Sequence, residues 1–164
     1  MNKLLIPIIL TTLFLAGCSK PTWNSFDMDD GEVTVWLPES MTPKYAGDGL
    51  KRGGRYSKLI AADKDNFGII VTILIPPFID GENIVKGKNF KSRLGCLEGK
   101  EMAKGSSNIS GHTAEKILCD GDSFGVHEIY RVVRDDRVIT VVIVNVTKDR
   151  SAADRILSEL SINI

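Results

Sequence analysis

The sequence has little of several features that mark common functional classes. Its 164 residues include only two histidines and three cysteines, and 21 Lys+Arg balance 21 Asp+Glu. A nucleic-acid-binding domain of this size is usually basic, because neutralisation of phosphates supplies most non-specific affinity. Nucleic acid is therefore not an expected partner. The sequence also lacks internal repeats and low-complexity segments, which favours one ordinary domain.

The apolar run near the N-terminus, residues 4–14, is too short for a transmembrane helix. Lys3 precedes it and small residues follow it, which is the plan of a secretory signal peptide. The run leads into Leu15-Ala16-Gly17-Cys18, which resembles the lipobox of bacterial lipoproteins at every position. The resemblance implies cleavage before Cys18 and lipidation of Cys18. An ordinary signal peptide with a chance cysteine is the alternative.

This resemblance divides the chain into a signal peptide over residues 1–17, a lipidated tether over 18–22 and a single domain over 23–164. In enterobacterial lipoproteins, an aspartate directly after the lipidated cysteine is the usual signal for retention in the inner membrane. Ser19 stands there instead. The resemblance thus implies the periplasmic face of the outer membrane, where the lipid on Cys18 holds the protein to the membrane.

The cysteine count agrees with export. If Cys18 carries lipid, Cys96 and Cys119 remain as an even pair in an oxidising compartment, and we expect them to form a disulfide. Two buried free thiols are the alternative. We expect no metal site, because the two cysteines and the distant His112 and His127 lack the spacing of metal ligands. No cofactor is expected either.

Alternating apolar residues and turn signals predict a domain made mostly of strands. Strands are expected at residues 32–37, 55–62, 67–75, 109–119, 124–133 and 138–147. The last three follow one another closely and predict an antiparallel meander. The runs at 67–75 and 138–147 are apolar on both faces, which is typical of central strands.

Two helices are expected between and after these strands. Asp80 is a suitable N-cap for a helix from residue 80 to about residue 97. Asp149 or Ser151 would cap a second helix, with Ile156 in its apolar stripe, and residues 161–164 would then run out extended. Residues 39–54 are expected to be a loop and residues 99–107 a polar connection.

Three sequence motifs lie in this order of expected strands and helices. They are Phe26-x-Met28-x(4)-Val33-x-Val35-x-Leu37-Pro38, then Ile109-Ser110-Gly111, and finally Arg155-Ile156-Leu157-Ser158-Glu159-Leu160-Ser161-Ile162. With these motifs, residues 23–164 resemble the Mog1/PsbP-like fold, most closely the DcrB-like bacterial lipoproteins. The resemblance implies an α+β fold, an α/β/α sandwich with a mainly antiparallel sheet between helices. It carries over no shared catalytic residues.

A catalytic motif is suggested by Gly121-Asp122-Ser123-Phe124-Gly125, which fits G-x-S-x-G. A nucleophile elbow needs a strand before the serine and a helix after it, but a strand pattern follows here. No histidine occurs after His127 to complete a triad. The motif is therefore interpreted as a hairpin turn, and catalysis at Ser123 is the less favoured alternative. His112 and His127 are expected to be surface or half-buried residues rather than an acid–base pair.

Candidate partner-binding residues gather on and around the loop at 39–54. Trp36 lies on a strand beside that loop, where it is either part of the core or an aromatic anchor for a partner. Loops of this length are unusual unless they are functional or mobile. The candidate surface consists of Trp36, Tyr45, Lys51, Arg52 and Arg55.

The expected function is that of a non-enzymatic, periplasm-facing lipoprotein whose domain binds another protein, as an accessory or an inhibitor. An immunity-type protein that neutralises a toxin in the periplasm is a specific version of this hypothesis, although no motif supports it. The alternatives are a carrier of a small or lipidic ligand between sheet and helix, and a serine hydrolase at Ser123.

Overall fold

The structure is a computed structural model. It describes residues 22–47, 55–75, 78–80, 83–85, 96, 99–121, 125–134 and 136–164. The expected signal peptide, the lipobox and Cys18 lie outside the described residues. Within the described part of the chain, no helix is long and apolar enough to cross a membrane.

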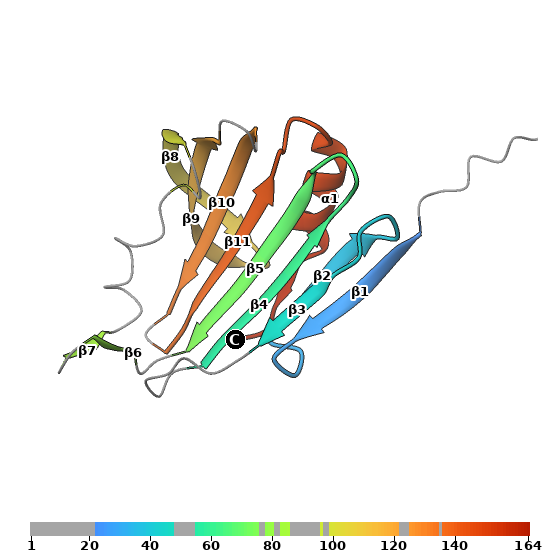
Figure 1. Cartoon of the computed structure of the whole chain (residues 1–164). Helices are drawn as coiled ribbons and strands as arrows, with labels where there is room; N and C mark the ends of the chain where they lie inside the picture. Colours follow the sequence, from blue (N-terminus) through green and yellow to red (C-terminus); the bar gives the residue numbers. More distant parts are fainter. Residues whose placement is uncertain are drawn as a thin grey trace, which may run out of the picture.

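A seven-stranded sheet forms the main layer of the molecule (Figure 1). Neighbouring strands all run antiparallel, so the expected mainly antiparallel sheet is confirmed. The most apolar strands occupy its middle, as their two-sided patterns predict. In spatial order the strands are β3 (Lys44–Gly47), β4 (Arg55–Ala62), β5 (Gly68–Ile75), β11 (Val138–Val144), β10 (Val126–Val133), β9 (His112–Asp120) and β8 (Lys100–Ile109).

A smaller sheet and one helix lie against one face of the main sheet (Figure 1). The small sheet pairs β1 (Trp23–Met28) and β12 (Ser161–Ile162) with the two sides of β2 (Val33–Pro38). Its strand β12 follows the helix α1 (Arg150–Glu159), so the end of the domain returns to its beginning. Within β2 the valines and the leucine are fully buried while Trp36 is exposed, which confirms the predicted alternation.

The main core lies between the large sheet and this second layer. Ile69, Val71 and Ile73 of β5 are fully buried or nearly so, as are Ile139 and Ile143 of β11. They belong to one cluster with side chains of β2 and α1. Each such side chain contributes about 1.5–3 kcal/mol through removal from water, so this cluster is the main source of stability. The space between sheet and helix is filled by protein side chains.

The helix α1 begins as the sequence predicts. The side chain of Asp149 accepts a hydrogen bond from the backbone nitrogen of Ala152 at 2.8 Å, which makes it the N-cap. Ala153 and Ile156 turn inward and are buried. The extended conformation of Leu160 then ends the helix.

The opposite face of the large sheet carries a smaller apolar cluster of Ile117, Cys119, Ile129 and Val142. Cys119 is bonded to Cys96, with 5.7 Å between their Cα atoms. The predicted disulfide is therefore present, and it joins strand β9 to the segment that precedes β8.

Two predicted connections are in fact strands. Residues 99–107 were expected to be a polar connection, but β8 occupies Lys100–Ile109 and pairs with β9 along its length. Its side chains are nearly all exposed, so no apolar alternation could reveal it. Ser110 and Gly111, expected within a strand, form the β8–β9 turn with φ values of 51° and 78°. Within the expected loop at 39–54, β3 pairs with β4.

The predicted helix over residues 80–97 is wrong at its start. Asp80 ends the short strand β6 (Phe78–Asp80), which pairs with β7 (Asn83–Val85). The β-branched Ile79 and Ile84, which are paired across β6 and β7, favour strands over a helix. Most of the remaining residues of that prediction lie outside the described part. One helix, α1, is present among the described residues, and it covers one face of the large sheet.

Candidate functional site

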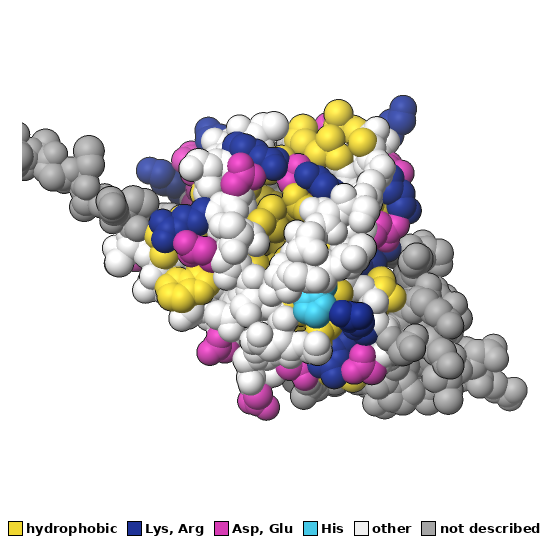
Figure 2. Space-filling view, turned by 180° about the vertical axis from the view of Figure 1, so that it is seen from behind, with side chains coloured by type: hydrophobic (Ala, Val, Ile, Leu, Met, Phe, Trp, Pro, Cys, Tyr) yellow, Lys and Arg dark blue, Asp and Glu magenta, His cyan; other side chains and the backbone are white. Residues whose placement is uncertain are grey.

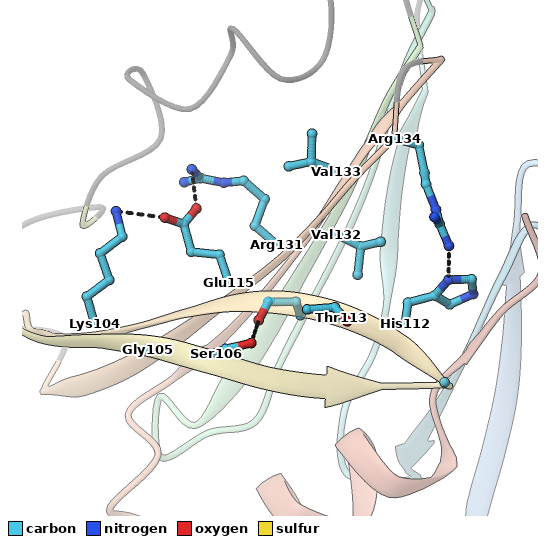
Figure 3. Close-up of a pocket in the computed structure, with 12 residues that line it drawn as sticks. Lys104, Gly105, Ser106, His112, Thr113, Glu115, Arg131, Val132, Val133 and Arg134 are labelled. Carbon is cyan, nitrogen blue, oxygen red and sulfur yellow. Dashed lines mark hydrogen bonds and ion pairs between the residues drawn. The ribbon is translucent and has the colours of Figure 1, made fainter.

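A surface cavity of about 570 Å³ lies beside the β8–β9 hairpin (Figure 3). Neighbouring residues Tyr130 and Val132 point into the main core, so Arg131 of the same strand points to the opposite face of the sheet. Figure 2 shows the side of the molecule turned away in Figure 1, where basic and acidic side chains are interspersed and apolar side chains form separate patches. The polar side chains that line the cavity are Lys104, Ser106, His112, Thr113, Glu115, Arg131 and Arg134.

Glu115 joins two of the cavity's cations. Its carboxylate lies 2.7 Å from Lys104 Nζ and 3.1 Å from Arg131 Nη1 (Figure 3). The hydrogen bond and the charge of Glu115 raise the pKa of Lys104. Burial lowers the pKa of Arg131, whose side chain is 2% exposed, while the charge of Glu115 opposes that effect. One carboxylate is thus shared by two cations, and the wall remains positively charged.

His112 and Arg134 form the second polar pair of the cavity. A nitrogen of the Arg134 guanidinium lies 2.7 Å from His112 Nδ1 (Figure 3). A guanidinium only donates, so Nδ1 accepts and the ring proton is on Nε2. That nitrogen donates to the carbonyl of Ile162 at 3.1 Å. His112 therefore connects Arg134, in the lining of the cavity, to β12.

Among the strands that the structure describes, none pairs with the outer side of β8, so β8 is an edge of the large sheet. Residues 100–106 of this strand are all exposed, and Met102 is 57% exposed. An edge strand presents backbone N–H and C=O groups that no neighbouring strand of the sheet uses. Lys104 and Ser106 from the same strand line the cavity, so the open edge and the cationic wall are continuous.

The residues proposed from the sequence as a partner surface lie elsewhere. Trp36 of β2 is 37% exposed and Tyr45 of β3 is 54% exposed. Tyr45 lines a second cavity, of about 510 Å³, together with Ser25 and Asp27. Its hydroxyl donates to Asp29 at 3.2 Å. Trp36 is not part of that lining. Lys51, Arg52 and the side chain of Arg55 lie outside the described residues.

The G-x-S-x-G stretch joins β9 to β10. Ser123 lies outside the described residues, but the two outer glycines are described. The backbone nitrogen of Gly121 donates to the carbonyl of Gly125 at 3.0 Å, and Gly125 has φ of 65°. Strand β10 begins at Val126, so the motif is followed by a strand, as the sequence predicts, and not by the helix of a nucleophile elbow.

The structure brings together a cluster that the sequence interpretation kept apart. His127 lies directly opposite Cys119 in the β9–β10 pairing. Atoms able to ligate a metal from Cys96, Cys119 and His127 all lie within 4.8 Å of one another. The register of the hairpin around residue 123 would have revealed this proximity, but spacing along the chain could not.

The cavity was also missed from the sequence, for a related reason. Its walls come from β8, which has no apolar period, from β9, and from β10, which follows in a later part of the chain. The one local signal was the hairpin turn, where Gly111 has a positive φ and its backbone nitrogen donates to the side chain of Asn108 at 3.0 Å. Reading that turn as a hairpin would have placed Ser106 opposite Glu115.

No protein-family model and no curated protein sequence matches the chain. Among solved structures, it is similar to cyanobacterial PsbP (CyanoP) from Synechocystis sp. PCC 6803, with 11% identity and a TM-score of 0.48 over 89% of this chain and 95% of that chain. It is also similar to the Ran-binding protein Mog1p of Saccharomyces cerevisiae, with 9% identity and a TM-score of 0.34 over 85% of this chain and 86% of that chain. This likeness concerns the fold alone.

Proposed function

We propose that this chain is a lipid-anchored, non-enzymatic accessory protein that binds an extended segment of a partner protein along the open edge of β8. The observation that carries the proposal is the exposure of residues 100–106 at the edge of a seven-stranded sheet. A partner strand would add its main-chain hydrogen bonds there and obtain specificity from side-chain pockets beside the edge.

The two edges of the sheet differ in a way that favours β8. The other edge strand, β3, has four residues, whereas β8 has ten. Long open edges are a liability that proteins usually shorten or protect with lysine. Lys100 and Lys104 lie on β8. Glu101 lies between them, so the strand carries a net charge of +1, which favours a partner strand with acidic residues.

The cavity beside the edge supports an acidic partner. Among the described residues, Lys104, Arg131 and Arg134 line it together with a single carboxylate, Glu115, which is already shared by the first two of them. Guanidinium groups bind carboxylates with strong, charge-assisted hydrogen bonds. An aspartate, a glutamate or a terminal carboxylate of the added strand therefore matches the cavity.

The lipobox resemblance supports the anchored part of the proposal. A lipid on Cys18 would hold the domain at the periplasmic face of the outer membrane and leave the edge of β8 free to meet a partner. A carrier of small ligands between sheet and helix is less well supported, because side chains fill that layer.

The test is site-specific photocrosslinking in cells that produce the full chain. A photoreactive phenylalanine analogue replaces Met102 on β8. In the control, the same analogue replaces Tyr45, a similarly exposed side chain on the other edge strand, β3. The proposal expects one defined protein adduct from position 102, lost when Lys104→Glu is added. Cys18→Ser should release the protein from the membrane fraction and weaken the adduct.

Absence of an adduct at position 102 would contradict the proposal, as would an adduct that survives Lys104→Glu unchanged. A defined adduct from position 45 alone would place the partner on the surface suggested by Trp36 and Tyr45 instead. The identity of the crosslinked protein distinguishes an inhibited toxin from an envelope component.

A further inference from the structure

The smaller cluster around Cys119, on the face of the large sheet opposite the main core, lies beside a buried histidine that packing does not explain. His127 is 1% exposed, and its Nε2 atom is buried without a hydrogen-bond partner in the described part of the chain. Buried polar side chains are nearly always hydrogen-bonded, because leaving one unsatisfied costs about 1–3 kcal/mol. An apolar residue of similar size would avoid this cost at a position that packs against a disulfide.

The other ring nitrogen determines the state of His127. Its Nδ1 lies 3.4 Å from the carbonyl oxygen of Gly125, which can only accept. Nδ1 therefore carries a proton, and in the neutral ring Nε2 then presents a lone pair. Histidines that bind metals commonly donate their second ring nitrogen to a backbone carbonyl in this way, which orients the ring.

The two sulfur atoms lie beside this ring. Cys119 is fully buried directly opposite His127, and Cys96 is half-buried. The two sulfur atoms and one ring nitrogen of His127 all lie within 4.8 Å of one another, which is close enough for the three residues to reach one ion after small side-chain movements. In the disulfide form the sulfur atoms are bonded to each other, so the site is closed to metal.

We propose that reduction of the Cys96–Cys119 disulfide opens a binding site for one monovalent copper ion, formed by the two thiolates and His127 Nε2. The reductant is a dithiol. It breaks the Sγ–Sγ bond by transferring two electrons and two protons, gives two cysteine thiols and is itself oxidised to a disulfide. Binding of Cu(I) then releases both thiol protons and forms two Cu–S bonds and one Cu–N bond.

The ligand set favours copper over other cations. Thiolates are soft ligands that select Cu(I) and zinc, and imidazole suits both. Structural zinc sites are almost always tetrahedral with four protein ligands. The described residues offer three, which matches trigonal Cu(I). The disulfide thus acts as a redox gate for the site. This inference does not depend on a partner for β8.

The experiment uses purified protein, reduced with excess dithiothreitol and desalted without oxygen, and oxidised protein as its pair. Each is titrated with Cu(I) against a chromophoric Cu(I) chelator. The proposal expects one equivalent of Cu(I) bound by the reduced protein and none by the oxidised protein. X-ray absorption of the copper form should report two sulfur ligands and one nitrogen ligand.

Three variants separate the site from general thiol chemistry. His127→Asn should weaken Cu(I) binding at least tenfold, whereas His112→Asn, the matched histidine control, should leave it unchanged. Cys96→Ser combined with Cys119→Ser should abolish it. Circular dichroism verifies that each variant folds. If a variant does not fold, the X-ray absorption spectrum of the wild-type copper form still decides whether copper has two sulfur ligands and one nitrogen ligand.

Equal copper binding by oxidised and reduced protein would overturn the proposal, as would a copper spectrum without nitrogen. Unchanged affinity in His127→Asn would also overturn it. A parallel titration with Zn²⁺ tests the choice of metal: tighter binding of zinc than of Cu(I) would refute the assignment to copper.

Discussion

Tyr130 donates its phenol proton to Glu128 across 2.6 Å, between two buried side chains on the same face of β10. The carboxylate of Glu128 also binds Lys116 Nζ and Arg150 Nη1, each at 2.9 Å. Lys116 lies over the ring of Tyr130 at 5.2 Å. These contacts join β9, β10 and the start of α1 around one carboxylate.

The first prediction concerns the pH dependence of stability. Burial alone would raise the pKa of Glu128, but hydrogen bonds from Tyr130, Arg150 and Lys116 outweigh it and hold that pKa below the ordinary 4.5. The contribution of Glu128 is therefore fully present above pH 4.5 and is lost as the pH falls through the lower, folded-state pKa. Urea unfolding should show this loss in the wild type, and a smaller loss in Glu128→Gln.

At neutral pH the same substitution should lower the free energy of unfolding by about 2 kcal/mol, because it removes charged hydrogen bonds to a buried group. Glu159→Gln is the matched control: its ion pair with Arg155 is exposed, and its loss should cost less than about 0.5 kcal/mol. Identical acid-side slopes for wild type and Glu128→Gln would contradict the role of this carboxylate.

A second prediction isolates the phenol. Tyr130→Phe keeps the ring under Lys116 and removes only the hydroxyl, so it should destabilise the protein by about 1 kcal/mol. Burial and the neighbouring Glu128 raise the pKa of Tyr130, so no phenolate should form below strongly alkaline pH. Ultraviolet titration of the tyrosines, compared between wild type and Tyr130→Phe, checks this. A phenolate signal near pH 10 that disappears in the variant would contradict it.

A third prediction concerns the disulfide as a stabilising cross-link. Cys96 and Cys119 are 23 positions apart, and closing a loop of that size contributes about 3 kcal/mol in the chain-entropy account. Reduction should therefore lower the urea midpoint of the wild type. The double variant Cys96→Ser with Cys119→Ser should have the lower midpoint and no response to reductant. Equal midpoints for oxidised and reduced wild type would show that the cross-link contributes nothing.

The sequence predicts a strand or helix well where burial of one face requires a regular spacing of apolar residues. Strands β4 and β5 and the helix α1 were predicted close to their observed bounds, because one or both of their faces are apolar and a cap or turn ends them. Strand β11 begins where predicted but ends at Val144, before the predicted end at residue 147. Strand β8 was missed because it forms through pairing with β9, while its side chains remain in water.

The candidate sites, too, could be predicted from the sequence only in part. The pairing of Cys96 with Cys119 could be predicted, since the count of cysteines constrains it. The proximity of His127 to that pair could not, because it depends on the exact register of β9 against β10. The cavity beside β8 likewise requires Arg131 and Glu115 to be direct neighbours across two strands. Sequence periodicity reports which residues share a face, but not which ones are opposite each other.

The last prediction tests the glycines that end the G-x-S-x-G stretch and the β8–β9 turn. Gly125 and Gly111 both have positive φ, so alanine at either position costs about 1 kcal/mol from backbone strain. At Gly111 an added Cβ meets open space, but at Gly125 it would lie 2.6 Å from the side-chain oxygen of Asn145. Gly125→Ala should therefore destabilise the protein clearly more than Gly111→Ala in thermal unfolding.

Asn145 itself has φ of 55°, a conformation that glycine adopts without strain. Adding Asn145→Gly to Gly125→Ala removes the clashing side chain, so the double variant should recover the steric part of the loss and retain the backbone part. If Gly125→Ala is no worse than Gly111→Ala, or if Asn145→Gly gives no recovery, the contact does not constrain this loop. Gly125 would then be needed for its backbone conformation alone.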